Sequence, residues 1–198
     1  CKILIVTGCM AQRYKEEITE EIPEVDAVLG TTSYGDIVKA LNEAEAGHVF
    51  REFKDINALP EDSGRRVITT GGHFGYLKIA EGCDKHCTYC IIPSLRGKFR
   101  SVPEERLLKQ AEYMASQGVR ELILVAQETT VYGTDLYGKK TLHILLKKLC
   151  QIKGIRWIRV LYCYPEEIYD ELIQVMKEEK KICHYLDLPI QHASDRIL

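Results

Sequence analysis

The sequence of 198 residues has no long hydrophobic run and no excess of basic charge, and each absence removes a class of protein. Its longest fully apolar stretches are only a few residues, as in 122–126, whereas a membrane-spanning helix needs about 20. The formal net charge of −2 creates no overall positive field that would attract nucleic acid or a membrane surface. The sequence therefore predicts no membrane partner, and charge alone does not identify the substrate.

The chain begins with Cys1 rather than Met, and we expect no secretory signal peptide, because Cys1-Lys-Ile-Leu-Ile-Val opens directly as a strand. We expect a fragment of a longer protein. Eight cysteines without a signal peptide favour reduced thiols over a disulfide framework, and this predicts a cytoplasmic location. Three cysteines stand singly among apolar residues and are predicted to be packing thiols, namely Cys150, Cys163 and Cys183.

The first part of the chain, residues 1–50, alternates strand and helix signals. The predicted order is a strand at 2–7, a helix reaching about 21, a strand at 25–29 and a helix at 34–46. This βαβα order predicts a parallel α/β layer. Periodicity fades in residues 51–72, where Pro, Ser and Gly accumulate, and we interpret this stretch as a linker.

The remainder, residues 73–198, repeats strand and helix signals at a spacing of roughly 30 residues. Strands are predicted at 76–80, 121–126, 157–163 and 185–190, with helices between them at 103–117, 141–153 and 165–180. Such an alternation is typical of a barrel-like parallel sheet, whose chemistry lies at the carboxyl ends of the strands. We therefore expect four segments to meet at one rim: the loop after Ala80, 127–132, 163–165, and Gln191 with His192.

Three cysteines, Cys83, Cys87 and Cys90, are separated by three and then two residues. A short loop with this spacing can bring three thiolates to one iron–sulfur cluster. Three ligands leave one iron open to a small molecule, as catalytic metal sites require. Zinc is an alternative because His86 could complete a Cys₃His site, although His86 directly precedes Cys87 and the two would struggle to face one centre. A redox or packing role is the remaining alternative.

The segment Cys83-Asp-Lys-His-Cys87-Thr-Tyr-Cys90 resembles the CxxxCxxC motif of radical S-adenosylmethionine enzymes. Its flank, Cys90-Ile-Ile-Pro-Ser-Leu-Arg-Gly-Lys-Phe-Arg-Ser101, is similar to the methylthiotransferases among them. Segments 126–133, 135–138, 162–167 and 185–192 resemble the branch that modifies an aspartate of a small-subunit ribosomal protein. The tRNA-modifying branch typically has Gly-Gln-Asn-Val where this chain has Ala126-Gln-Glu-Thr.

The resemblance implies the fold, the cofactors and the reaction. The implied fold is a partial radical S-adenosylmethionine (β/α) barrel at 73–198, preceded at 1–50 by a truncated α/β methylthiotransferase N-terminal domain. The implied ligands are Cys83, Cys87 and Cys90, whose [4Fe–4S] cluster binds and cleaves S-adenosylmethionine. The implied activity is β-methylthiolation of an aspartate in a small-subunit ribosomal protein; the resemblance does not identify the electron donor.

The resemblance also extends to the segment Val6-Thr-Gly-Cys9-Met-Ala-Gln-Arg13, which is similar to the third cysteine motif of the family's N-terminal domain. It implies that Cys9 is a ligand of a second [4Fe–4S] cluster in the longer protein. The two earlier cysteines of that set are missing here, so in this chain Cys9 is expected to be a spare thiol.

Four further residues are predicted to bind the cofactors. Tyr89 is expected beside the adenine or the cluster, with plain loop packing as the alternative. Gln127 and Glu128 follow a buried strand, where they could hold the methionine ammonium or a ribose, and Gln191 has the same position after the last strand. Two other functions stay open: methylthiolation of modified adenosine in tRNA, and a zinc-stabilised binding module without catalysis.

Overall fold

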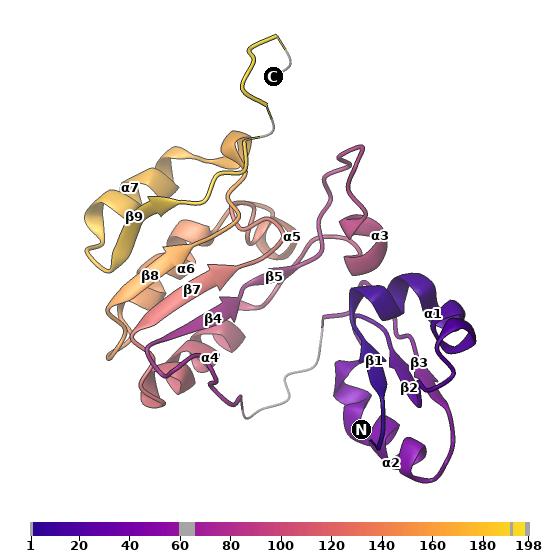
Figure 1. Cartoon of the computed structure of the whole chain (residues 1–198). Helices are drawn as coiled ribbons and strands as arrows, with labels where there is room; N and C mark the ends of the chain where they lie inside the picture. Colours follow the sequence, from indigo (N-terminus) through magenta and orange to yellow (C-terminus); the bar gives the residue numbers. More distant parts are fainter. Residues whose placement is uncertain (1, 60–65, 191, 197–198) are drawn as a thin grey trace. The chain divides into compact units, whose positions relative to one another are not determined.

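The computed structural model describes residues 2–59, 66–190 and 192–196. These residues belong to two compact units (Figure 1). The first unit joins Cys1–Arg66 with Cys83–Lys98, and the second joins Val67–Gly82 with Phe99–Leu198. The cysteine segment therefore makes most of its contacts within the first unit. The predicted domain boundaries, 1–50, 51–72 and 73–198, remain a prediction.

The first unit contains a three-stranded parallel sheet in the order β1 (Ile5–Thr7), β2 (Ala27–Leu29) and β3 (Phe50–Glu52). Helix α1 (Cys9–Glu21) follows β1, and a 3₁₀ turn, η1 (Tyr34–Asp36), leads from β2 into α2 (Ile37–Glu45). The central strand β2 is entirely buried, with Val28 packed in one apolar cluster and its two neighbours in another. The predicted βαβα order is confirmed, whereas β3 was not predicted.

The second unit contains a four-stranded parallel sheet in the order β4 (Phe74–Lys78), β7 (Glu121–Val125), β8 (Trp157–Val160) and β9 (Ile182–Leu186). The helices that connect these strands are α4 (Glu104–Ser116), α6 (Leu142–Cys150) and α7 (Asp170–Glu178) (Figure 1). This is the predicted run of βα units. The last strand lies three residues earlier than the predicted start at residue 185.

Side chains alternate between the two faces of this second sheet, as expected for strands. One face buries Leu77, Leu122, Leu124, Ile158 and Val160 against apolar side chains of α4, α6 and α7 in one cluster. Each such side chain contributes roughly 1.5–3 kcal/mol to folding. In the strand register, Ile123 is paired with Tyr76 on one side and with Arg159 on the other. These three side chains therefore lie on the opposite face of the sheet, where they are partly exposed.

Several short elements follow the strands of this sheet along the sequence. Strands β5 (Ala80–Glu81) and β6 (Arg100–Ser101) form an antiparallel ladder, and α3 (Ile92–Arg96) lies in the segment between them. Helix α5 (Thr134–Tyr137) follows β7, and the 3₁₀ turn η2 (Pro165–Glu167) follows β8. No helix within the described residues has both the length and the apolar character needed to cross a membrane.

Gly133, at the start of α5, allows a test of the packing around that helix. Its φ is 90°, and a Cβ atom added there would collide with Oγ1 of Thr141 and lie 3.0 Å from Cδ2 of Tyr137. We expect Gly133→Ala to lower the free energy of unfolding by about 2–3 kcal/mol, because strain and overpacking add. Urea denaturation measures this.

Gly138→Ala is the matched control, since Gly138 has φ 68° and nothing within 4 Å of an added Cβ. It should cost only about 1 kcal/mol, the conformational part of the penalty. Equal losses of unfolding free energy in the two variants would contradict the close packing of Thr141 and Tyr137 against Gly133.

Candidate cluster and cofactor site

Cys83, Cys87 and Cys90 lie in the first unit as partly buried thiols that form no disulfide. The backbone N–H of Lys85 donates to Sγ of Cys83 at 3.4 Å, and the N–H of Cys90 donates to the carbonyl of Cys87 at 3.0 Å. Amides that point at thiolates are the usual partners of cluster sulfurs. Tyr89, predicted beside the cofactor, is 77% exposed.

Glycines mark both ends of the cysteine segment. Gly82 has φ 76° and Gly97 has φ 72°, a backbone region that costs other residues about 1–2 kcal/mol. The N–H of Cys83 donates to the carbonyl of Gly97 at 3.2 Å, which ties the first cysteine to the end of α3. The backbone conformation of Gly82 thus produces a tight turn immediately before the first cysteine.

Cys9, the first residue of α1, lies beside α3. Nε of Arg96 donates to Sγ of Cys9 at 3.2 Å. Next to it, the Thr31 hydroxyl donates to the carbonyl of Leu95 at 2.9 Å in a buried position. Consecutive residues of α3 therefore hold the strand-end loop after β2 and the cysteine at the start of α1. A cationic donor beside Cys9 suits a thiolate sulfur.

The donor chemistry of Cys83, Cys87 and Cys90 fits an iron–sulfur cluster, because the three thiols are reduced, close in sequence and partly accessible. The three cysteine side chains do not converge on one point. Among the described residues, no three His, Cys, Asp or Glu side chains lie close enough together to hold a metal ion. The Cys₃His arrangement with His86 is likewise not formed. Closing around a metal therefore requires rearrangement of the loop.

In the second unit, Glu128 follows β7 and is only 3% exposed. Its Oε1 accepts hydrogen bonds from the N–H of Thr130 at 2.9 Å and from the N–H of Tyr164 at 3.4 Å. The hydroxyl of Thr130 also donates to this oxygen. Neighbouring Gln127 has a buried Oε1 with no hydrogen-bond partner among the described residues. The end of β7 is therefore followed by two buried hydrogen-bond acceptors, the amide oxygen of Gln127 and the carboxyl group of Glu128.

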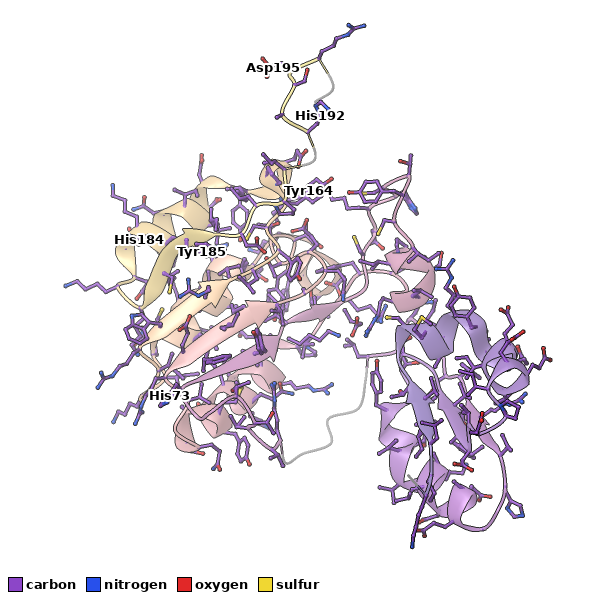
Figure 2. The ribbon with its side chains drawn as sticks, viewed as in Figure 1. His73, Tyr164, His184, Tyr185, His192 and Asp195 are labelled. Carbon is purple, nitrogen blue, oxygen red and sulfur yellow. The ribbon has the colours of Figure 1, made fainter. Side chains whose placement is uncertain are left out.

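Thr129 joins the loops that follow β7 and β8. Its hydroxyl donates to the carbonyl of Leu161 at 2.8 Å, and its N–H donates to the carbonyl of Tyr162 at 3.1 Å. Figure 2 shows Tyr164 at this carboxyl end of the sheet, whereas His73 lies at the opposite end. The predicted meeting of segments 127–132 and 163–165 is confirmed.

The other two segments of the predicted rim have different outcomes. Gln191 lies outside the described residues. His192 is exposed, and its Nδ1 accepts a hydrogen bond from the N–H of Ser194 at 3.0 Å (Figure 2). The cysteine segment belongs to the first unit. The meeting of all four segments therefore stays a prediction.

One pair of charged residues had no predicted role. Lys78 at the end of β4 forms an ion pair with Glu81, whose side chain is almost fully buried. In the sequence, this ion pair comes immediately before Gly82 and the cysteine segment. The burial of Glu81 is the one feature that distinguishes this ion pair from an ordinary surface pair, and the sequence does not reveal that burial.

The single cysteines behave as packing thiols. Cys150 and Cys163 are buried, and burial raises the pKa of each thiol to about 11. Cys183 is partly buried, and burial raises its pKa too. All three therefore remain protonated at neutral pH, which is consistent with the predicted lack of a chemical role.

Comparison with known proteins defines the class. The family model of the radical SAM superfamily matches residues 77–198, and the chain belongs to that superfamily. A solved structure of the radical S-adenosylmethionine methyltransferase TsrM from Kitasatospora setae, with cobalamin and a [4Fe–4S] cluster bound, has a TM-score of 0.50. It is 14% identical and covers 62% of this chain and 23% of its own, so it supports the fold alone. The predicted partial radical S-adenosylmethionine fold is confirmed, and membership implies a [4Fe–4S] cluster and S-adenosylmethionine.

The particular relatives are ribosomal protein uS12 methylthiotransferases named RimO. The protein of Lachnoclostridium phytofermentans is 66% identical over 197 residues, which is 100% of this chain and 45% of that protein. The proteins of Clostridium botulinum and Clostridioides difficile are each 53% identical, over 45% and 44% of their lengths. The chain thus spans about 45% of the length of these curated relatives.

Proposed function

We propose that this chain is the part of a uS12 methylthiotransferase that binds and cleaves S-adenosylmethionine. The observation that carries the proposal is 66% identity across the whole chain to a protein of that name. The target is an aspartate side chain of uS12, a protein of the small ribosomal subunit, and a ribosomal substrate supports a cytoplasmic location for the reaction. The electron donor is left unassigned.

Cys83, Cys87 and Cys90 hold the cluster in this proposal. When bound, the cluster and S-adenosylmethionine supply a 5′-deoxyadenosyl radical that can remove hydrogen from the aspartate Cβ. The glycines that flank the segment fix its two ends, and the N–H of Lys85 supports the Cys83 sulfur. In the longer protein Cys9 is a ligand of the second [4Fe–4S] cluster.

Gln127 and Glu128 bind S-adenosylmethionine in this proposal, at the carboxyl edge of the second sheet. Glu128 brings a buried carboxyl group, whose carboxylate form favours the methionine ammonium. Gln127 brings a buried acceptor that has no partner in the described part of the chain, which suits an ammonium or a ribose hydroxyl. Tyr89 and Gln191 are proposed as further cofactor contacts on the basis of their sequence positions.

Gln127→Leu separates binding from folding. A buried acceptor without a partner destabilises the folded protein, so its removal should leave the urea midpoint unchanged or raise it. The KM for S-adenosylmethionine should rise about tenfold, the value of one hydrogen bond to a charged donor. A lower midpoint with an unchanged KM would assign Gln127 a purely structural role.

Mass spectrometry of uS12 and of tRNA from a deletion strain tests the substrate. We expect uS12 to lose its methylthio group while methylthio-adenosine in tRNA is retained. Complementation with the wild-type gene should restore the modification of uS12, and a gene encoding Cys87→Ala should not. Loss of methylthio-adenosine with the uS12 mark intact would instead favour the tRNA-directed function.

A further inference from the structure

Tyr162 has an unusual backbone. It lies two residues beyond the end of β8 with φ 58°, in the left-handed region that a residue with a bulky side chain rarely adopts. Among the described residues only Lys15 is another non-glycine with positive φ. Such strain persists only where the surrounding structure enforces it, and it is common at functional sites.

Hydrogen bonds from two neighbouring loops enforce this conformation. The N–H of Tyr162 donates to Oδ2 of Asp187, which follows β9, at 3.1 Å. The carbonyl of Tyr162 accepts a hydrogen bond from the N–H of Thr129 at 3.1 Å. The next residue, Cys163, donates its N–H to the carbonyl of Asp187 at 2.9 Å. Both polar backbone groups of Tyr162 are therefore already used.

The strain does not serve to bury the Tyr162 side chain. Its side chain is 52% exposed, whereas Tyr132 in the preceding loop is fully buried and donates its hydroxyl to the carbonyl of Val102. Two residues further on, Tyr164 donates its N–H to Glu128, so Tyr162 belongs to the same strand-end region as the proposed cofactor contacts. The backbone thus presents an accessible aromatic ring at the edge where chemistry is expected.

We propose that Tyr162 is a specificity-determining residue that contacts the polypeptide segment of uS12 carrying the target aspartate. This inference rests on the proposed function. A ring with an apolar face and one hydroxyl is typical of protein interfaces. The adenosine of a cofactor would instead be largely enclosed in a concave site, and a half-exposed ring on a loop fits a polypeptide better.

Tyr162→Gly tests the proposal because glycine adopts a positive φ without strain. In protein reconstituted with its cluster, we expect the Kd for purified, fluorescently labelled uS12 to rise about tenfold or more. The thermal midpoint should not fall, and the KM for S-adenosylmethionine in 5′-deoxyadenosine formation should stay unchanged. Tyr162→Asn, which also tolerates this backbone, should behave in the same way.

Trp157→Ala is the matched control, since Trp157 is 53% exposed at the opposite end of the same strand. It should leave the Kd for uS12 unchanged. An unchanged Kd in both Tyr162 variants would overturn the inference, and so would a rise in the KM for S-adenosylmethionine alone, which would assign the ring to the cofactor. If the wild-type protein itself does not bind uS12, the proposed function fails and this inference fails with it.

Discussion

Replacing Cys87 by Ala is expected to abolish cluster binding and the formation of 5′-deoxyadenosine. Three thiolates are the fewest that can hold a four-iron cluster with one open iron, so losing one leaves two ligands. The fold should persist, because the hydrogen bond from Cys90 goes to the carbonyl of residue 87, which alanine also has. Iron content, sulfide content and product formation under reductant measure the effect.

Cys183→Ala is the appropriate control for this experiment. Cys183 is also partly buried but lies in β9, away from the cysteine segment in sequence. Its replacement should leave iron content and 5′-deoxyadenosine formation at the wild-type level. Undiminished product formation by Cys87→Ala would remove Cys87 from the mechanism.

Replacing Glu128 is expected to have the second-largest effect, with two components that different variants separate. Glu128→Ala removes the acceptor of the Thr130 and Tyr164 N–H groups, and should cost about 2–4 kcal/mol of folding free energy. It should also raise the KM for S-adenosylmethionine about 100-fold, because this variant lacks the carboxyl group proposed to bind the methionine ammonium.

Glu128→Gln keeps an oxygen for the two N–H groups while removing the charge. We expect near-normal stability by urea denaturation and a KM for S-adenosylmethionine raised by about tenfold. Glu166→Gln, in an exposed position after β8, should change neither quantity. A Glu128→Gln variant with normal KM would contradict the role of Glu128 in binding the cofactor.

The main helices and strands were predictable because their apolar residues recur at recognisable intervals. Helix α4 buries Leu107, Ala111 and Met114, which recur at three- and four-residue intervals, and β7 alternates buried and partly exposed positions. The three residues of β3 and the two of β6 contain too few positions to show an alternation, and the five residues of α3 make little more than one helical turn. They form because neighbouring strands and loops supply their hydrogen bonds.

The last strand was predicted late for a related reason. The apolar residues of 185–190 include Leu188 and Ile190, which are exposed, whereas Ile182 is buried and pairs with Ile158. A register irregularity between β8 and β9 further separates hydrogen bonding from the apolar pattern. Apolar character alone therefore placed the strand too far along the chain.

The candidate site was predictable to the extent that general rules govern it. Carboxyl ends of adjacent parallel strands lie at one edge, so the loops after β7 and β8 had to meet. The burial of Glu81 and the left-handed backbone of Tyr162 depend on partners distant in sequence, including Thr129 and Asp187. No local pattern records such contacts.

The most direct test of the central claim is anaerobic reconstitution of the purified chain with iron and sulfide, followed by S-adenosylmethionine and a reductant. We predict a brown protein with about four irons per chain that forms 5′-deoxyadenosine, in keeping with one cluster on three cysteines. A colourless protein that retains stoichiometric zinc and forms no 5′-deoxyadenosine would contradict the account.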